Sequence, residues 1–270
     1  MVKKRLIFTL LYNNGEFMLS RNFRLQRVGN LEWLKRNYDF SRTAAQIDEL
    51  VVLNVERNRF SNDDFISHLQ KLCDFCFVPI TAGGGIRRLE DASALLSNGA
   101  DKVLVNTMAA DCSHKVIEIA KRYGQQCIVL GVDIRKSNGS TCALVDCGSK
   151  LVALEISDYL TRLRELPVGE WMITSINRDG TGQGFDSELL ELLPPNFERP
   201  VILAGGAGKP EHFLDLLRNP KVSGLATAHL HNFVGDGLKQ VRDLLLRDGQ
   251  ELPIWDANEI AALKSSVDEI

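Results

Sequence analysis

Short apolar runs rich in β-branched residues recur along the chain and alternate with amphipathic stretches. The runs predict eight strands, at residues 5–11, 49–54, 77–82, 102–106, 127–133, 171–176, 200–204 and 223–228. The stretches between them predict helices at 63–72, 89–98, 114–123, 157–165, 187–193 and 210–218. Nearly continuous apolar strands that alternate with helices are typical of a parallel sheet covered by helices. Eight such units in about 250 residues predict a (β/α)8 barrel of the α/β class, with an open doubly wound sheet as the alternative.

An internal repeat indicates that the barrel consists of two similar halves. Three pairs of positions at matching places in the pattern are each separated by 121 residues: Glu49 and Glu170, Gly85 and Gly206, and Asn106 and Thr227. A half-barrel would leave its strand edges unpaired, so we expect the halves to close on each other. The prediction is therefore a single barrel domain over residues 1–255, followed by a C-terminal tail at 256–270 with no assigned chemistry.

Composition and charge exclude several classes of protein. Of the 270 residues, 44% are apolar and 25% are charged, which excludes a chain disordered throughout. The 32 basic and 35 acidic residues give a net charge of −3 and no broad field for nucleic acid or an anionic membrane. Any bound anion must therefore be held by a local site, and we expect neither nucleic acid nor membrane as a partner.

The chain start and the cysteines indicate a reducing compartment. Residues 1–11 imitate a secretory signal, but the apolar run is short and no cleavage pattern follows, which favours a buried strand. Six cysteines are too sparse for a disulfide framework, and buried thiols are favoured over zinc or redox use for Cys73 and Cys76. The five histidines show no metal spacing. We therefore predict a cytoplasmic protein that needs no metal and no other cofactor.

Glycines and small polar residues follow the predicted strands, at the end of the barrel where such proteins carry their sites. Backbone N–H groups beside glycine can approach an oxyanion closely, and a following helix adds its positive end. Tight turns alone are the alternative explanation, but the repeated placement favours phosphate binding. Two predicted cradles result: a first cradle of Gly85, Asn106 and Thr107, and a second cradle of Asp179, Gly180, Gly206, Thr227 and Ala228. Together they suit a ligand with a phosphate at each end.

Four segments give the chain a resemblance to a known family. The segments 80–86, 101–107, 174–181 and 205–209, the last being Gly-Gly-Ala-Gly-Lys, are similar to the cyclase subunit of imidazole glycerol phosphate synthase. The similarity runs from about residue 3 to about residue 250, and it favours this cyclase over its isomerase sister. The resemblance implies a barrel that receives ammonia from a glutaminase docked at its floor and closes an imidazole ring on a ribulosyl phosphate.

Charged residues open four of the predicted strands. Arg5, Glu49, Lys102 and Glu170 could pair as a ring at the barrel floor, because buried ions need partners. From the residues alone this ring is a structural plug. The resemblance matches all four to an ammonia gate, which we favour, and it places Asp101 at the interface with the glutaminase. Ammonia has to pass as neutral NH₃, and a dry conduit would keep it unprotonated.

The chain departs from the family at its catalytic centre. The resemblance implies two acid–base aspartates, at the ends of strands 1 and 5. Asp133 matches the second, whereas Leu11 stands at the first and can neither donate nor accept a proton. Leu19 stands where the family has a lysine on a flexible loop, and Arg21 can replace the charge but not the mobile ammonium. Glu16, which we place on the same loop, is a poor substitute for the missing acid.

These features lead to a functional prediction with two alternatives. We predict a subunit with reduced or lost cyclase activity that relays ammonia from a glutaminase, as a heterodimer, for amidation of a sugar in lipopolysaccharide or O-antigen biosynthesis. A separate sugar amidotransferase and a phosphorylated small molecule would be further partners. The first alternative is an active cyclase that converts the phosphoribulosyl formimino-carboxamide substrate and ammonia to imidazole glycerol phosphate and aminoimidazole carboxamide ribotide. The second, a phosphoribosyl sugar isomerase, also needs a carboxylate on strand 1, so Leu11 argues against it.

Overall fold

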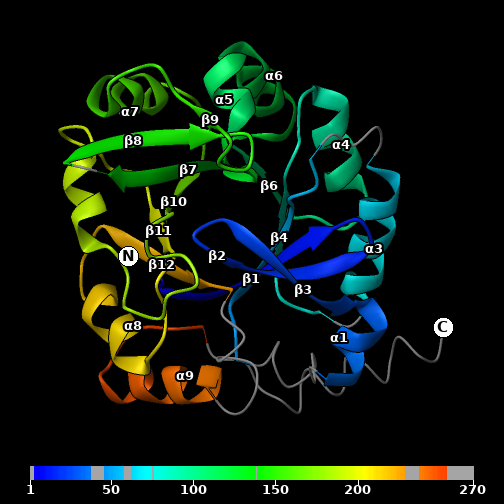
Figure 1. The fold of residues 1–270 in the computed structure, drawn as a ribbon, viewed down its shortest axis with the longest axis vertical. Helices are drawn as coiled ribbons and strands as arrows, with labels where there is room; N and C mark the ends of the chain where they lie inside the picture. The colour runs from blue at the N-terminus through cyan, green and yellow to red at the C-terminus, as the bar shows by residue number, and fades with distance from the viewer. Residues whose placement is uncertain are drawn as a thin grey trace.

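Eight parallel strands close into a barrel (Figure 1), as seen in a computed structural model that describes residues 3–37, 46–57, 62–74, 76–137, 139–228 and 237–253. Each strand pairs in parallel with the next, and the last pairs with the first, which closes the sheet. The predicted (β/α)8 barrel is confirmed and the open sheet is excluded. In barrel order the strands are β1 (Arg5–Asn13), β4 (Glu49–Asn54), β5 (Ile80–Gly83), β6 (Lys102–Val105), β7 (Ile128–Ser137), β10 (Glu170–Ser175), β11 (Val201–Ala204) and β12 (Val222–Thr227).

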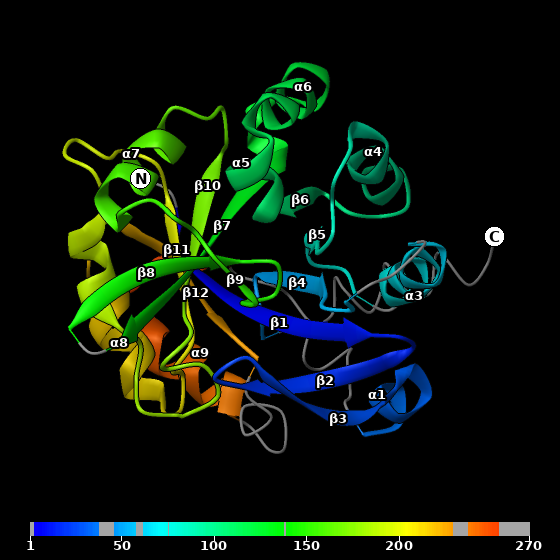
Figure 2. The same ribbon diagram turned by 45° about the horizontal axis from the view of Figure 1, so that its top comes forward.

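Helices lie around the outside of the strands (Figure 2). The longer ones are α3 (Asp63–Cys73), α4 (Leu89–Ser97), α6 (Ser113–Tyr123), α7 (Ile156–Arg164), α8 (Pro210–Leu217) and α9 (Gly237–Arg247). Shorter segments are α1 (Leu31–Asn37), α5 (Thr107–Asp111) and the 3₁₀ turns η1 (Gln125–Cys127) and η2 (Ser187–Leu192). The helix predicted at 187–193 is thus a 3₁₀ segment, and the strand predicted at 77–82 begins only at Ile80.

Side chains of the strands fill two layers. On β1, Leu6, Phe8 and Leu10 point outward into the large core between sheet and helices, whereas Ile7 points into the barrel. This alternation follows from the period of two in a strand. The inner layer is a small apolar cluster formed by Ile7, Val51, Leu104, Val129, Met172, Ile202, Ala204 and Ala226. The barrel interior below the mouth is therefore apolar.

Two hairpins extend the barrel at matching places in its two halves. The first, β2 (Glu16–Arg21) and β3 (Arg24–Asn30), follows β1, and the second, β8 (Ser140–Val145) and β9 (Lys150–Leu151), follows β7. The positive φ angles of Asn14 (48°) and Gly15 (79°) make the tight turn that starts the first hairpin. The prediction that Glu16 lies on a loop is therefore wrong, because the segment after β1 is a β-hairpin. Glu16 begins β2 and forms an ion pair with Arg27 at 2.6 Å.

The last described residues are attached to the barrel floor. Arg242 of α9 forms a buried ion pair with Asp48, and its guanidinium also donates to the carbonyl oxygens of Gln46 (3.1 Å) and Pro253 (2.9 Å). The tail predicted at 256–270 lies outside the described residues. Among the helices that the structure describes, none has the length and apolarity needed to cross a membrane.

Candidate functional site

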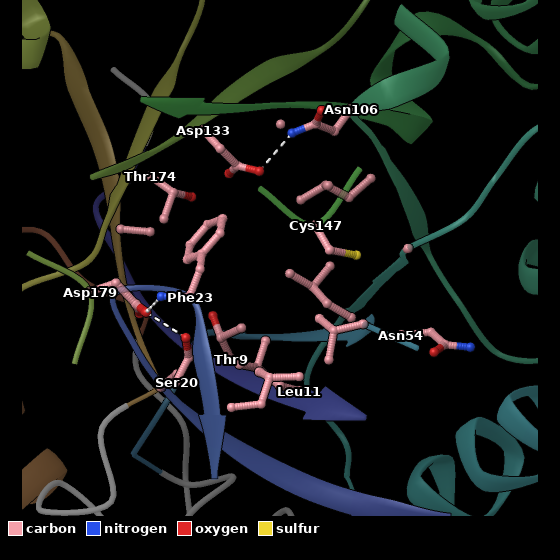
Figure 3. A pocket seen from close by; sticks show the side chains of 18 of the residues that line it. Thr9, Leu11, Ser20, Phe23, Asn54, Asn106, Asp133, Cys147, Thr174 and Asp179 are labelled. Atoms are coloured by element: carbon pink, nitrogen blue, oxygen red, sulfur yellow. Dashed lines mark hydrogen bonds between the residues drawn. The ribbon is translucent and has the colours of Figure 1, made fainter. Parts of the chain in front are cut away.

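A cavity of about 1550 Å³ opens at the C-terminal ends of the barrel strands (Figure 3). It is lined by every residue that the sequence assigned to this end of the barrel: Gly85, Asn106, Thr107, Asp133, Asp179, Gly180, Gly206, Thr227 and Ala228. The structure thus brings both predicted cradles and the predicted acid–base residue into one space. That the cradles bind phosphate stays a prediction.

The turns of both cradles require glycine. Gly84 (φ 92°) and Gly206 (φ 109°) have left-handed backbone conformations that favour glycine. A Cβ atom would lie 2.0 Å from the Asn54 carbonyl oxygen at Gly84, and 2.1 Å from the Gly184 carbonyl oxygen at Gly206. These close contacts are enough to explain why both positions are glycine. Because both turns also line the cavity, they are available to a ligand as well.

Asp133 lies near the end of the barrel part of β7, which continues to Ser137 in the second hairpin, and it is held by Asn106, directly after β6, and by Thr174 of β10. Asn106 Nδ2 donates to Asp133 Oδ2 at 2.8 Å, and the Thr174 hydroxyl donates to the same carboxylate. Burial raises the pKa of Asp133 to about 7, with a smaller contribution from the negative charge of Asp179, while the hydrogen bonds from Thr174 and Asn106 partly oppose the rise. A carboxyl with a pKa near neutrality is suited to proton transfer.

The raised pKa predicts a pH-dependent contribution to stability. The folded chain holds its proton on Asp133 up to about pH 7, whereas the unfolded chain loses it near the ordinary value of 3.8. This contribution is complete below about pH 4 and is lost as the pH rises to about 7. Relative to the native chain, Asp133→Asn should therefore gain roughly 2–4 kcal/mol in free energy of unfolding between pH 4 and pH 8. Urea unfolding of both proteins at each pH measures this, and a pH-independent difference would contradict it.

Leu11 lies across the barrel from Asp133, because β1 and β7 are four strands apart in a ring of eight. It pairs with Leu53 of β4 and with Met18 of β2, and its side chain lines the cavity (Figure 3). Leu19 and Leu53 line the same side of the cavity. This wall is apolar where the resemblance implies a carboxylate and an ammonium group.

The first hairpin is attached to the loop that carries the second cradle. Ser20 Oγ and the Phe23 N–H both donate to Asp179 Oδ2, at 2.5 and 3.0 Å. The Asn22 N–H donates to the Asp179 carbonyl oxygen at 3.0 Å. A Cβ atom at Gly180 would lie 2.0 Å from the Ser20 carbonyl oxygen, so only glycine permits this contact. We had not predicted a role for Ser20, Asn22 or Phe23, because their contacts depend on a hairpin for which the Asn-Gly turn was the only signal in the sequence.

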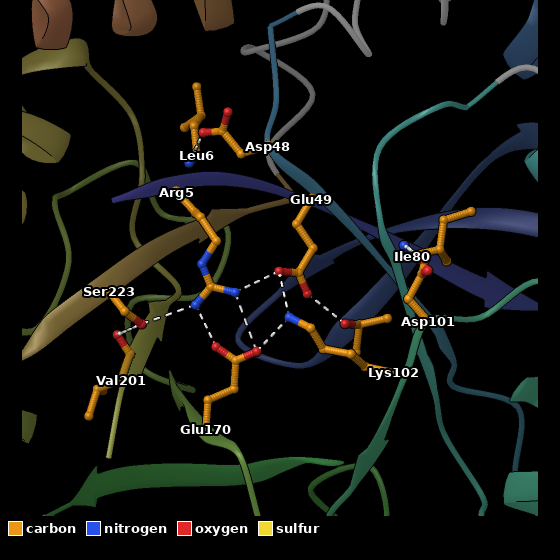
Figure 4. Close-up of polar contacts among 11 residues, drawn as sticks. Arg5, Leu6, Asp48, Glu49, Ile80, Asp101, Lys102, Glu170, Val201 and Ser223 are labelled. Carbon is orange, nitrogen blue, oxygen red and sulfur yellow. Dashed lines mark hydrogen bonds and ion pairs between the residues drawn. The ribbon is translucent and has the colours of Figure 1, made fainter. Parts of the chain in front are cut away.

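At the opposite end of the barrel, the four charged residues form a paired ring (Figure 4), referred to below as the floor ring. Arg5 Nη1 lies 2.7 Å from Glu49 Oε2, and Arg5 Nη2 forms an ion pair with Glu170. Lys102 Nζ lies 3.0 Å from Glu49 Oε2 and 2.7 Å from Glu170 Oε1. Each carboxylate therefore has both cations as partners, in the arrangement that the sequence predicted. Its use as a gate stays a prediction.

Electrostatics and two hydroxyl groups stabilise the floor ring. Burial alone would raise the pKa of Glu170, but the hydrogen bonds and charges of Arg5 and Lys102 outweigh it and lower the pKa. Thr81 Oγ1 donates to Glu49 Oε1 at 2.6 Å, and Ser223 Oγ accepts from Arg5 Nη2 at 3.1 Å. These hydroxyl groups were not predicted, because only the barrel register places them beside the ring.

Asp101 lies on the same face as the floor ring, directly before β6. Its side chain is exposed, and Oδ2 accepts a hydrogen bond from the Ile80 N–H at 2.8 Å. The position fits the predicted interface, although no partner chain tests it.

Comparisons with known proteins agree with this architecture. The family model described as "Histidine biosynthesis protein" matches residues 36–233. The chain is 44% identical over 250 residues, 93% of each protein, to a protein of Parasynechococcus marenigrum strain WH8102 that is provisionally named imidazole glycerol phosphate synthase subunit hisF2. It is 32% identical over 257 residues to imidazole glycerol phosphate synthase subunit HisF of Streptococcus gordonii, covering 94% of this chain and all of the relative. The corresponding subunit of Thermotoga sp. strain RQ2 is 31% identical over 250 residues, 92% and 97% of the two chains.

The chain therefore belongs to the histidine biosynthesis protein family, among its HisF-like cyclase subunits. The resemblance drawn from the four sequence segments is confirmed.

Proposed function

We propose that this chain relays ammonia within a glutamine-dependent complex that amidates a sugar in lipopolysaccharide or O-antigen biosynthesis. The observation that carries the proposal is the combination of a fully paired floor ring with a leucine at position 11. A conduit needs an entrance and walls, and the floor ring and the apolar inner layer would supply them. It needs no proton donor at the end of β1, and there Leu11 offers none.

The barrel interior supports a path for a neutral molecule. Between the floor ring and the cavity lies the apolar inner layer, which includes Ile7, Val51 and Leu104. An ammonium ion would lose its hydration there without gaining a partner, whereas NH₃ carries no charge to desolvate. Opening the ring would require a glutaminase that offers one of the cations an alternative carboxylate or carbonyl partner at the floor.

The cavity supports a second role, which is to hold a phosphorylated ligand where the ammonia arrives. Asp133, with its pKa near 7, could move a proton at that place, but across the barrel Leu11 provides no complementary group. Binding without ring closure is the result that we expect from this arrangement. A separate amidotransferase would then activate the sugar.

Association with a glutaminase tests the relay. We expect one chain and one glutaminase to form a complex at micromolar concentration. The glutaminase should hydrolyse glutamine only within this complex. Asp101→Asn keeps an acceptor for the Ile80 N–H but removes the charge, and it should weaken association by roughly tenfold. Asp158→Asn, on the first turn of α7, removes an exposed charge at the other end of the barrel and serves as the control. A chain that stays monomeric beside each candidate glutaminase would contradict the proposal.

The second candidate function is the active cyclase. The specific observation in its favour is that Asp133 keeps a near-neutral pKa and its bond to Asn106. Formation of the imidazole product by the unmodified chain would establish the cyclase function.

A further inference from the structure

Leu11, Leu19, Leu53 and Phe23 form an apolar surface on the cavity, referred to below as the apolar wall, with polar residues of the same hairpin such as Ser20 and Arg21 beside it. This surface points to a class of ligand. We infer that the cavity holds the ring form of a sugar phosphate, with the phosphate on the second cradle and an apolar face of the sugar against Leu11, Leu19 and Phe23. The inference rests on the proposed function and names the ligand of the same site.

The apolar wall is built by the first hairpin and its neighbour strands. Leu11 and Leu19 are partly exposed and line the cavity together with Leu53. Opposite them, Asp133, Asn106 and Thr174 supply the polar wall. A ligand between these walls is expected to show hydroxyl groups to one side and C–H or methyl groups to the other, since a polar group without a partner is costly to bury.

Phe23 gives the apolar wall a flat aromatic surface. Its half-buried ring lines the cavity and points into it (Figure 3). The ring also packs against Gly148 in the turn between β8 and β9, where a Cβ atom would lie 2.6 Å from Phe23 Cδ2. The backbone of Phe23 is fixed by its N–H bond to Asp179. The ring is therefore preorganised, which lowers the cost of stacking a sugar on it.

The second cradle lies beside this wall. The bond of Phe23 to Asp179 joins the hairpin directly to Gly180, and β12, which ends at Thr227, pairs with β1. A phosphate on Gly180, Gly206 and Thr227 would thus place the attached sugar next to Phe23 and Leu11. A pyranose has C–H groups on its faces that suit this surface. An open-chain polyol carries hydroxyl groups along its length, and those facing the leucines would lose their hydrogen bonds.

Binding of three phosphorylated probes tests the inference, with the full chain and calorimetric titration. N-acetylglucosamine 1-phosphate and glucose 1-phosphate are ring forms that differ by an acetamido group, and sorbitol 6-phosphate is an open chain. We expect both ring forms to bind more tightly than the open chain, by roughly tenfold. Inorganic phosphate, as a fourth probe, reports on the phosphate cradles without the sugar.

Two variants test whether the preference for the ring forms depends on the apolar wall. Leu11→Asn adds polarity without charge, and Phe23→Ala removes the ring while keeping the N–H that bonds Asp179. Each should weaken the binding of N-acetylglucosamine 1-phosphate by about tenfold and leave the affinity for inorganic phosphate unchanged. Leu151→Ala, which removes an exposed leucine on the second hairpin outside the cavity, is the control and should change neither. Far-UV circular dichroism and urea unfolding confirm that each variant is folded.

The outcomes separate this inference from the proposed function. If phosphate binds but the ring forms gain nothing over sorbitol 6-phosphate, or if neither variant changes their affinity, the inference is wrong and the phosphorylated ligand of the proposed function stands. If no probe binds, both the inference and the predicted cradles are wrong. The ammonia relay is tested independently by the glutaminase complex.

Discussion

Replacing Leu11 with aspartate is expected to raise ring-closing turnover by a factor of ~10²–10⁴, from a level near background in the native chain. The substitution places an acid across the barrel from Asp133, which already has a pKa of about 7 and a hydrogen bond from Asn106. The measurement is formation of the imidazole product from the phosphoribulosyl formimino-carboxamide substrate, with ammonium salt at high pH as the nitrogen source. External ammonia makes the assay independent of a glutaminase.

Two further variants make this result specific. Leu11→Asn has nearly the size and polarity of the aspartate but cannot transfer a proton, so it should stay at background. The double variant Leu11→Asp with Asp133→Asn should also lose the gain, because both groups are needed. Efficient turnover by the native chain would show that it is an active cyclase and that the relay is not its role. If Leu11→Asp gains nothing although it is folded, an acid at this position is not sufficient for ring closure, and Leu19 becomes the next position to change.

The barrel could be predicted from the sequence because its strands are buried on both faces. Runs such as 49–54 and 171–176 have few polar interruptions, and their strands β4 and β10 begin and end within one residue of the prediction. The floor ring could also be predicted, since Arg5, Glu49, Lys102 and Glu170 each open a strand and parallel strands start on one face. The period of two in β1 likewise places Leu11 toward the interior with Ile7.

The hairpins could not be predicted in the same way. Residues 16–30 contain an apolar run at Phe17–Leu19 but lack a long alternating pattern, and β3 is largely exposed. Their strand structure depends on pairing with the end of β1, a contact that local propensity does not encode. For the same reason the bond of Ser20 to Asp179, which are 159 residues apart, appears only in three dimensions. The residues that shape the roof of the cavity were therefore missed, while those at the strand ends were found.

Removing Glu49 from the floor ring is expected to destabilise the fold strongly. Its side chain is 2% exposed and accepts from Arg5, Lys102 and the Thr81 hydroxyl. In Glu49→Ala, the two half-buried cations would share Glu170 alone, and one of them would lack a neutralising charge. Breaking a buried pair in this way costs about 3–5 kcal/mol, since the remaining ion has already lost its water. Urea unfolding followed by circular dichroism measures the change, with an unchanged m-value as evidence that the transition is the same.

The matched control is an ion pair of the same type at the surface. Glu188 pairs with Lys136 at 2.7 Å, but its side chain is 74% exposed, so Glu188→Ala should cost less than about 1 kcal/mol. A loss for Glu49→Ala as small as that of the control would mean that water reaches the ring and replaces the missing carboxylate. A wet floor would let ammonia pick up a proton before it enters the barrel. The stability of the ring and its use as an entrance for neutral ammonia therefore depend on the same property, which is the exclusion of water from Glu49.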